Sequence, residues 1–316
     1  MCRFVSSQNP VRLKKAYLEK YKVKLLQNKL DILMNAYPEI KAVLPDKISA
    51  KKLLVGNFKY LTRVYCAFTG YLNGKTTAEK DSIKNAFKKG GFNYDSHKSK
   101  IANFLTDLAN EFEIHNCVYC DLEDVTSFTK ANGSLVRKFE TEHVLDKGEC
   151  PLVALSLYNF VPSCGTCNGP AIKGTRTIGD TEAEIAKLSP SAEGYDFENK
   201  VTFVVNLITP GVSDLNATSH ADDYEITFNV REALYQKSID LFQLKSRYNN
   251  RIIKLELLKW REWRINRPDN AVQEYANHFN IPLDRAFEEL FEFDLRRREH
   301  YPMEKARRDV MQQIDQ

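Results

Sequence analysis

The pattern of apolar and polar positions predicts helices through the first third of the chain. Between residues 11 and 113, apolar residues recur three or four positions apart among lysines, and Pro38, Asn73-Gly74 and Gly90-Gly91 interrupt the pattern. This spacing is typical of amphipathic helices rather than strands. Proline and glycine pairs are typical of turns between such elements. We therefore expect residues 1–113 to form a helical region.

The pattern changes after residue 113 and again after residue 176. Residues 114–176 consist of short segments with turn residues, and Asn132-Gly133 is a strong signal for a β-hairpin. Two segments farther on, 200–208 and 223–230, are rich in β-branched and aromatic residues and predict two strands around a Gly, Pro and Ser loop.

A long helical stretch is predicted over residues 233–266, before one or two further helices. Pro268 should close it. Seven of its residues are expected to line one buried face: Leu241, Leu244, Tyr248, Ile252, Leu255, Leu258 and Trp260. Residues 177–316 thus predict a mainly helical α+β region, and the whole chain an α+β fold that is mostly helical.

Composition indicates an ordinary folded protein. Hydrophobic residues make up 43% of the 316 positions and charged residues 28%, a balance typical of globular chains. The sequence starts without an apolar segment of signal-peptide length, and no stretch approaches the roughly 20 apolar residues that span a bilayer. We expect a cytoplasmic protein that does not bind membranes.

Charge is distributed unevenly along the chain. Residues 1–100 contain 21 lysines and arginines but only 7 acidic residues, whereas the rest of the chain is net acidic. Such a basic segment is typical of a surface that faces nucleic acid or an acidic protein partner. Solvated helix faces explain the same charges equally well, so both interpretations stay open.

Two Cys-x-x-Cys pairs predict a zinc site. Cys117 and Cys120 form the first pair, Cys164 and Cys167 form the second, and 43 residues separate the pairs. Each pair can present two thiolates to one face of a tetrahedral ion, and four thiolates leave no open position for a substrate. We therefore predict a structural zinc ion that pins the two ends of the enclosed segment together.

Such a clamp would gather four polar residues between and beside the knuckles: Glu142, His143, Asn159 and Asn168. Hydrolysis of a phosphodiester needs oxygen ligands for a hard divalent cation and a base that activates water near pH 7. A neutral histidine is such a base, once an amide or a backbone carbonyl fixes its tautomer.

The order and spacing of these residues resemble the HNH endonucleases, which have the ββα-metal fold. The matching positions are Cys117-x-x-Cys120, Glu142-His143, Asn159, and Cys164-x-x-Cys167-Asn168, followed by Lys173-Gly174. The resemblance implies an HNH core over residues 114–176, between the helical region 1–113 and the region 177–316.

The resemblance also implies a role for each residue. His143 would be the general base, and Glu142 and Asn168 the ligands of one catalytic Mg²⁺ or Mn²⁺. Asn159 would brace the following loop and help to orient His143. The residue before the histidine is often Asp in this family and is Glu here, and the final position is Asn rather than His. Lys173 could contact a phosphate of the nucleic acid, or simply face solvent.

A weaker resemblance, of layout and a few short strings, is to stand-alone HNH proteins of bacterial anti-phage defence such as the nuclease component of Septu systems. It implies double-stranded DNA as substrate and an ATPase as partner protein. Two alternatives to a DNA endonuclease stay open from the sequence. One is a zinc-stabilised nucleic-acid-binding or scaffold protein without catalysis, and the other is an RNase.

Overall fold

The computed structural model describes residues 10–211, 214–291 and 302–313. The chain divides into two compact units, residues 2–196 and 197–316. Each unit is described by itself. The first unit therefore contains both the predicted helical region 1–113 and the predicted core 114–176, which pack together as one body.

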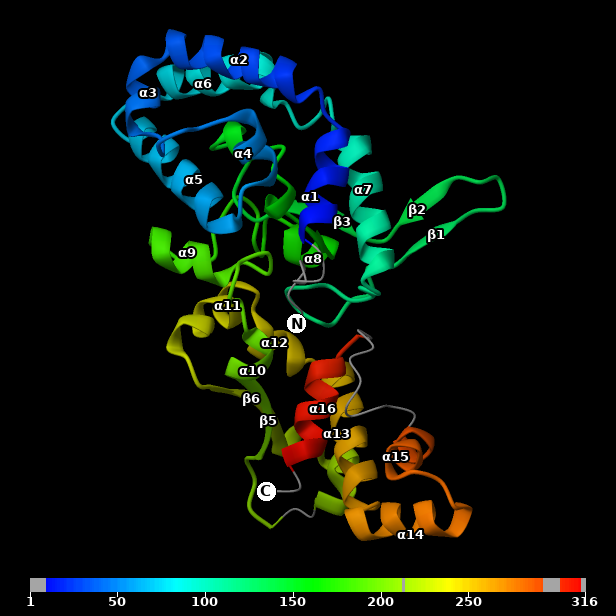
Figure 1. Ribbon diagram of the computed structural model, residues 1–316. Helices are drawn as coiled ribbons and strands as arrows, with labels where there is room; N and C mark the ends of the chain where they lie inside the picture. Colours follow the sequence, from blue (N-terminus) through cyan, green and yellow to red (C-terminus); the bar gives the residue numbers. More distant parts are fainter. Residues whose placement is uncertain (1–9, 212–213, 292–301, 314–316) are drawn as a thin grey trace. The chain divides into compact units, whose positions relative to one another are not determined.

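Residues 10–111 are helical, as the sequence predicts (Figure 1). The helices are α1 (Pro10–Glu19), α2 (Val23–Ala36), α3 (Pro38–Val43), α4 (Ala50–Val55), α5 (Phe58–Leu72), α6 (Thr77–Phe87), the π-turn η1 (Lys88–Phe92) and α7 (Lys98–Glu111).

Local sequence signals explain where these helices begin and end. Thr76 and Glu79 form a reciprocal capping box that starts α6. Gly91 has a φ of 111°, a conformation that glycine adopts without strain, and it ends the π-turn. The apolar faces form a core in which Leu30, Leu61 and Phe68 are fully buried.

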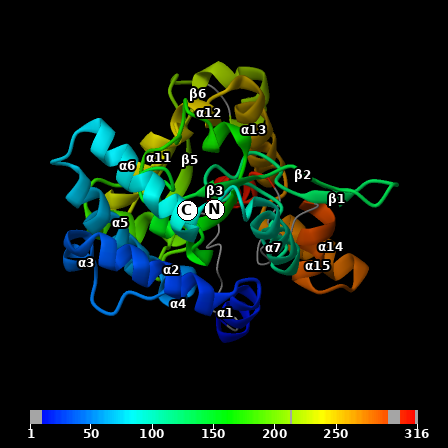
Figure 2. The same cartoon turned by 90° about the horizontal axis from the view of Figure 1, so that it is seen from above.

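Short strands and turns follow α7 in the same unit. They are β1 (Ser127–Thr129), β2 (Leu135–Arg137), β3 (Glu140–His143), the 3₁₀ turns η2 (Pro151–Val153) and η3 (Leu157–Asn159), β4 (Phe160–Ser163), α8 (Gly165–Asn168) and α9 (Glu182–Leu188). Strands β1 and β2 form the predicted hairpin, in which Gly133 has a positive φ of 81°. This hairpin projects away from the helices of its unit in both views (Figures 1 and 2).

The second unit combines one antiparallel strand pair with helices. Its elements are α10 (Phe197–Lys200), β5 (Val201–Leu207), the 3₁₀ segment η4 (Asp214–Asp223), β6 (Tyr224–Val230), η5 (Ala233–Tyr235), α11 (Gln236–Leu241), α12 (Leu244–Tyr248), α13 (Arg251–Ile265), α14 (Asp269–Phe279), α15 (Leu283–Phe291) and α16 (Glu304–Gln312). Strands β5 and β6 pair from Val201 opposite Val230 to Leu207 opposite Tyr224, which confirms the two predicted strands.

The helical stretch predicted over residues 233–266 is broken rather than continuous. Gln243 adopts a left-handed conformation before α12, and Asn250 caps a new helix with its side chain. The second break changes the phase of the apolar stripe, so Ile252 is 77% exposed and the prediction that it is buried is wrong. Pro268 does separate two helices, and in the described residues three helices follow it instead of one or two.

Candidate metal and catalytic site

Both Cys-x-x-Cys pairs lie in tight turns with the same backbone pattern. The N–H of Asp121 donates to the carbonyl of Cys117 at 2.9 Å, and the N–H of Asn168 donates to the carbonyl of Cys164 at 3.0 Å. In each turn the residue after the second cysteine thus bonds back to the first. This places the two thiols of each pair on the same side of their turn.

The structure brings all four thiols together, although the pairs are more than 40 residues apart. Their Sγ atoms lie within 4.8 Å of one another, and Cys120 Sγ is 3.9 Å from Cys164 Sγ. A tetrahedral zinc ion with Zn–S bonds of about 2.3 Å needs sulfur atoms about 3.8 Å apart. The four cysteines form no disulfide, and all are buried. The cluster therefore fits the predicted zinc ion.

Backbone N–H groups prepare two of these sulfurs to carry negative charge. The N–H of Cys164 donates to Cys117 Sγ at 3.3 Å, and that of Cys167 donates to Cys164 Sγ at 3.4 Å. Burial alone would raise the pKa of the Cys117 thiol, but hydrogen bonds from the other three cysteines hold this pKa well below its usual value. Burial and the neighbouring cysteines raise the pKa of Cys120. A zinc ion would bind all four as thiolates.

Strand β3 carries Glu142 and His143, and it pairs with β4, which leads into α8 and the second cysteine pair. The two strands pair antiparallel, with Glu142 opposite Val161 and His143 opposite Phe160. Helix α8, which follows β4 and contains Cys167 and Asn168, packs against β3. Glu142 and His143 thus lie on β3, Asn159 on the turn η3 and Asn168 on α8.

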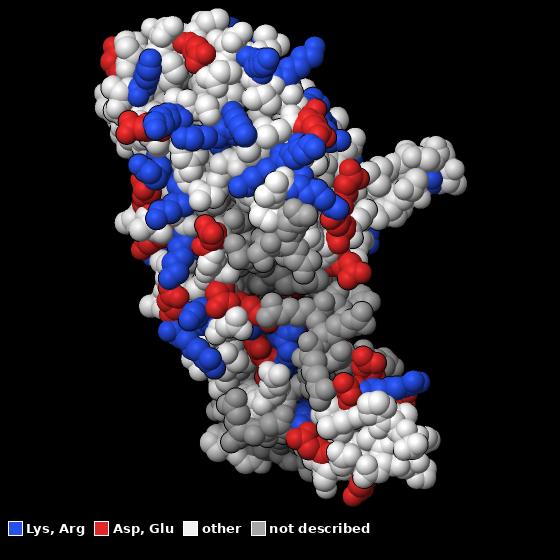
Figure 3. Space-filling model, viewed as in Figure 1, with Lys and Arg blue, Asp and Glu red and all other residues white. Residues whose placement is uncertain are grey.

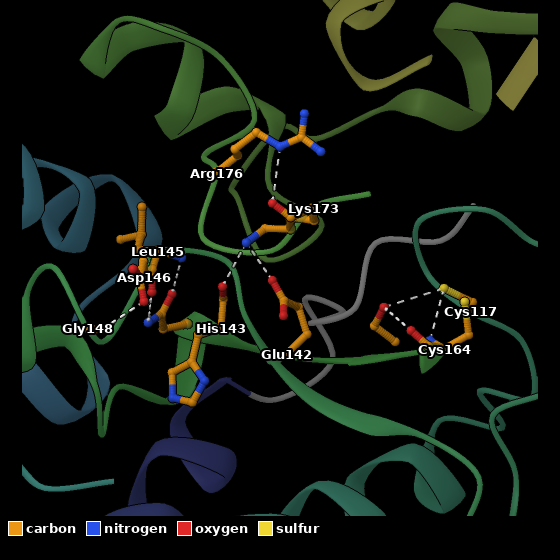
Figure 4. Close-up of polar contacts among 11 residues, drawn as sticks. Cys117, Glu142, His143, Leu145, Asp146, Gly148, Cys164, Lys173 and Arg176 are labelled. Carbon is orange, nitrogen blue, oxygen red and sulfur yellow. Dashed lines mark hydrogen bonds and ion pairs between the residues drawn. The ribbon is translucent and has the colours of Figure 1, made fainter. Parts of the chain in front are cut away.

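Glu142 is buried against Lys173. Its Oε1 lies 2.5 Å from Lys173 Nζ, so the two side chains form a buried ion pair. The same ammonium group donates to the carbonyl of His143 at 3.0 Å (Figure 4). Burial raises the pKa of Glu142, and the charge of Lys173 is the largest influence that lowers it again.

The ring of His143 lies on the other side of β3 from the carboxylate (Figure 4). Its Nε2 is 3.3 Å from the carbonyl oxygen of Ala154. Because a carbonyl only accepts, Nε2 carries the proton and Nδ1 keeps the lone pair in the neutral ring. Burial, then the charge of Lys147, lowers the pKa of His143 well below its usual value. The histidine is therefore neutral at pH 7.

Two aromatic rings enclose this imidazole. The rings of Tyr94 and Phe160 lie edge-on to it, with centroids 4.5 and 4.9 Å away, and only 5% of His143 is exposed. Lys147 Nζ in turn lies 4.9 Å from the centroid of the Tyr94 ring. The imidazole is therefore largely shielded from solvent by its neighbours.

Asn159 is fully buried and braces the loop that follows His143. Its Oδ1 accepts from the N–H of Leu145 at 2.7 Å, and its Nδ2 donates to the carbonyls of Leu145 and Val153, each at 3.0 Å. It does not touch the imidazole. Since Val153 precedes Ala154, Asn159 instead holds the turn whose carbonyl fixes the tautomer of His143.

Two residues lie differently from what the sequence interpretation required. Lys173 is fully buried and paired with Glu142, so it does not face solvent, and its contact with nucleic acid stays a prediction. Asn168 is half-buried at the end of α8, and its side chain forms no hydrogen bond with the described residues. Its amide oxygen is available to a ligand.

Two contacts of the site were not predicted. Tyr94 packs on His143 from a turn 49 residues upstream. The contact with His143 Nε2 comes from the backbone carbonyl of Ala154, whose side chain has no polar group. No spacing rule joins either residue to the Glu-His pair. The only sequence signal is that Tyr94 follows Gly90-Gly91 closely, which indicates a turn with an aromatic side chain that could pack on another segment.

The basic charge of the first unit is on its surface. On the face drawn in Figure 3, lysine and arginine side chains are spread over the helices of residues 10–111. In the part of the chain that is described, none of the helices combines the length and apolar character needed to cross a membrane.

Comparisons with protein families, with curated proteins and with solved structures return no match for this chain. The functional interpretation consequently depends on its own residues: the cysteine cluster, the buried Glu142–Lys173 pair and the neutral histidine on β3.

Proposed function

We propose that this chain is a metal-dependent endonuclease of the HNH type that hydrolyses phosphodiester bonds of DNA, with a role in anti-phage defence beside an ATPase partner. The observation that carries the proposal is the neutral imidazole of His143, whose Nε2 is held by the carbonyl of Ala154 so that Nδ1 is the free base. Its placement next to Glu142 on β3, beside the cysteine cluster, supports the same conclusion.

In the proposed reaction, His143 Nδ1 takes a proton from a water molecule as the water oxygen forms a bond to phosphorus. The bond from phosphorus to one ribose oxygen breaks, and that oxygen takes up a proton from solvent. Asn159 keeps the turn at Val153 and Ala154 in place, so the ring presents Nδ1 and not Nε2. General base catalysis of this kind contributes about 10²–10⁴ to the rate.

Glu142 and Asn168 are the residues that would hold the catalytic Mg²⁺ or Mn²⁺. When bound, the ion would polarise the phosphate and neutralise the charge that develops on it. Glu142 offers a carboxylate and Asn168 an amide oxygen, both of which suit a hard cation. Lys173 meanwhile neutralises the buried carboxylate, so a metal ion at Glu142 competes with this ammonium group for the same charge.

One observation favours a second candidate, a zinc-stabilised nucleic-acid-binding or scaffold protein without catalysis. His143 is buried between two aromatic rings, and Glu142 is paired with a lysine, which are also the features of a structural histidine and a structural carboxylate. The two candidates share the zinc cluster, so only activity separates them.

A plasmid-cleavage assay with Mg²⁺ or Mn²⁺ tests the proposal. We expect the wild type to nick or linearise the DNA, His143→Ala to be inactive, and His278→Ala, which changes an exposed histidine on α14, to retain full activity. Cleavage of RNA but not DNA in a matched digest would replace DNA by RNA as the substrate. Absence of cleavage with either metal, with and without a co-purified partner, would favour the second candidate.

A further inference from the structure

A cavity of about 580 Å³ lies among the N-terminal helices, away from the cysteine cluster. It is formed by the segment between α1 and α2, the first turns of α2, the π-turn η1, and the turn that precedes α7. Six lysines line it, against a single carboxylate, that of Glu19: Lys20, Lys22, Lys29, Lys88, Lys89 and Lys100. We call it the lysine cavity.

The positive charge in the lysine cavity is not neutralised by the protein. Within the described residues, none of the six lysines forms an ion pair with a carboxylate. Lys100 Nζ donates to the carbonyl of Lys20 at 2.7 Å and lies 5.2 Å from the centroid of the Tyr21 ring, which leaves its charge uncompensated. Burial, and then the charges of Lys100 and Lys29, lower the pKa of His97 in the wall of the same cavity.

Two helices also begin at this cavity. Residues Lys22 and His97 are the N-caps of α2 and α7, each a helix of 14 residues, and neither cap offers a side-chain hydrogen bond to the first turn. The first N–H groups of a helix carry partial positive charge and bind anions such as phosphate. Helix ends and lysines thus add to one positive field.

The wall also contains apolar and aromatic residues. Tyr21 and His97 face each other with ring centroids 5.3 Å apart, and Leu25 and Leu26 line the cavity beside them. A volume of about 580 Å³ lies within the range of small-molecule sites, about 300–1,000 Å³. A wall of this kind takes a ligand with both a planar or apolar part and several negative charges.

We propose that the lysine cavity binds a phosphate-bearing ligand of nucleotide size, and that the turn formed by residues 93–97 transmits its binding to His143. Asn93, Ser96 and His97 of this turn line the cavity, whereas Tyr94 of the same turn packs on the imidazole of His143. The N–H of His97 donates to the carbonyl of Tyr94 at 2.8 Å, which links the two sides of the turn.

The second half of this proposal rests on the proposed function, because it concerns access to the base. Tyr94 is one of the two rings that pack on the imidazole of His143, a residue that is only 5% exposed. A ligand that pulls His97 and Ser96 toward its phosphates displaces Tyr94 and uncovers the imidazole. The lysine cavity would then be a regulatory site, one that couples the nuclease to a phosphorylated small molecule.

Isothermal titration calorimetry tests the binding half. The probes are ATP, inorganic tripolyphosphate and a short 5′-phosphorylated oligonucleotide, which distinguish a free nucleotide, phosphate charge alone and a nucleic-acid end. We expect at least one to bind with one equivalent per chain. The double variant Lys29→Ala/Lys89→Ala should bind it at least about tenfold more weakly, a change of about 1.4 kcal/mol.

The matched control is Lys51→Ala/Lys59→Ala, which removes two exposed lysines outside the cavity. It should bind within about twofold of the wild type, since exposed charges at a distance are screened. Absence of binding for all three probes, or an equal loss in both double variants, would overturn the site.

Hydrogen–deuterium exchange at the imidazole C2 position, read by mass spectrometry, tests the connection without using nuclease activity. The ligand that binds in the calorimeter should change the exchange half-life of His143 at least about twofold and leave that of His278 unchanged. The Lys29→Ala/Lys89→Ala variant should lose this effect. An unchanged His143 in the ligand-bound protein would refute the connection, whether or not the chain cleaves DNA.

Discussion

Replacing Lys173 by methionine removes the ammonium group that is paired with buried Glu142 while keeping a side chain of similar length. The two side chains are 0% and 4% exposed, and their charged atoms lie 2.5 Å apart. Loss of one partner from a buried ion pair typically costs about 3–5 kcal/mol, because the remaining charge has neither water nor a counter-ion. We expect Lys173→Met to lower the free energy of unfolding of the first unit by that amount at pH 7.

The cost should depend on pH and on Glu142. Burial already raises the pKa of Glu142, and without Lys173 this pKa rises further, so the carboxyl group takes up a proton more readily in the variant. The loss of stability should therefore shrink as the pH falls. The double variant Glu142→Gln/Lys173→Met, which buries no charge, should regain most of the stability that the single variant loses.

Urea unfolding of the zinc-loaded protein is a suitable assay. Far-UV circular dichroism follows both units, whereas both tryptophans, Trp260 and Trp263, lie in the second unit and provide an internal reference. Lys138→Met is the matched control, because Lys138 also lies 2.5 Å from a carboxylate, that of Asp124, but is exposed. Exposed pairs contribute about 0–1 kcal/mol. Equal losses in Lys173→Met and Lys138→Met would refute the reasoning.

Three further predictions concern the metals and the histidine. Cys120→Ser should lose zinc by elemental analysis and unfold at a lower temperature, because one of the four ligands is gone. Cys66→Ser, which changes a cysteine outside the cluster, should keep the zinc content and the unfolding temperature of the wild type. Glu142→Gln and Asn168→Ala should each raise the Mg²⁺ concentration for half-maximal cleavage, and an unchanged concentration would exclude them as ligands. Burial lowers the pKa of His143 in the folded protein, whereas the unfolded chain binds a proton below about pH 6.5. The free energy of unfolding should therefore be highest above that pH and should fall below it, by up to about 1.4 kcal/mol per pH unit. His143→Gln should flatten this decline in pH-dependent urea unfolding.

Short-range patterns predicted much of the fold and of the zinc cluster. The helices over residues 10–111 follow from a 3.6-residue period of apolar positions. The two Cys-x-x-Cys turns predict a four-cysteine cluster if the two segments pack together. These features are encoded within a few residues of one another. Ile252 was predicted incorrectly because a single capping asparagine shifts the helical phase, which a period count across the break does not register.

Contacts between distant segments were not predictable in this way. Lys173 follows a motif in which a solvent-facing lysine or a phosphate contact is expected, and only the packing of its loop under β3 makes it the counter-ion of Glu142. Tyr94 reaches His143 from a turn that belongs to the helical region by its sequence. The burial of a side chain depends on the whole unit, so neither role could be assigned from local spacing.

The central claim, that His143 is the base of a phosphodiester hydrolase, is tested most directly by the single-turnover rate of DNA cleavage at saturating metal in wild type and His143→Ala. Zinc content and the unfolding transition are measured on the same samples. We expect His143→Ala to lower the single-turnover rate at least about 100-fold while the zinc content and the unfolding transition stay unchanged. A His143→Ala protein that cleaves within about threefold of the wild-type rate would contradict the claim.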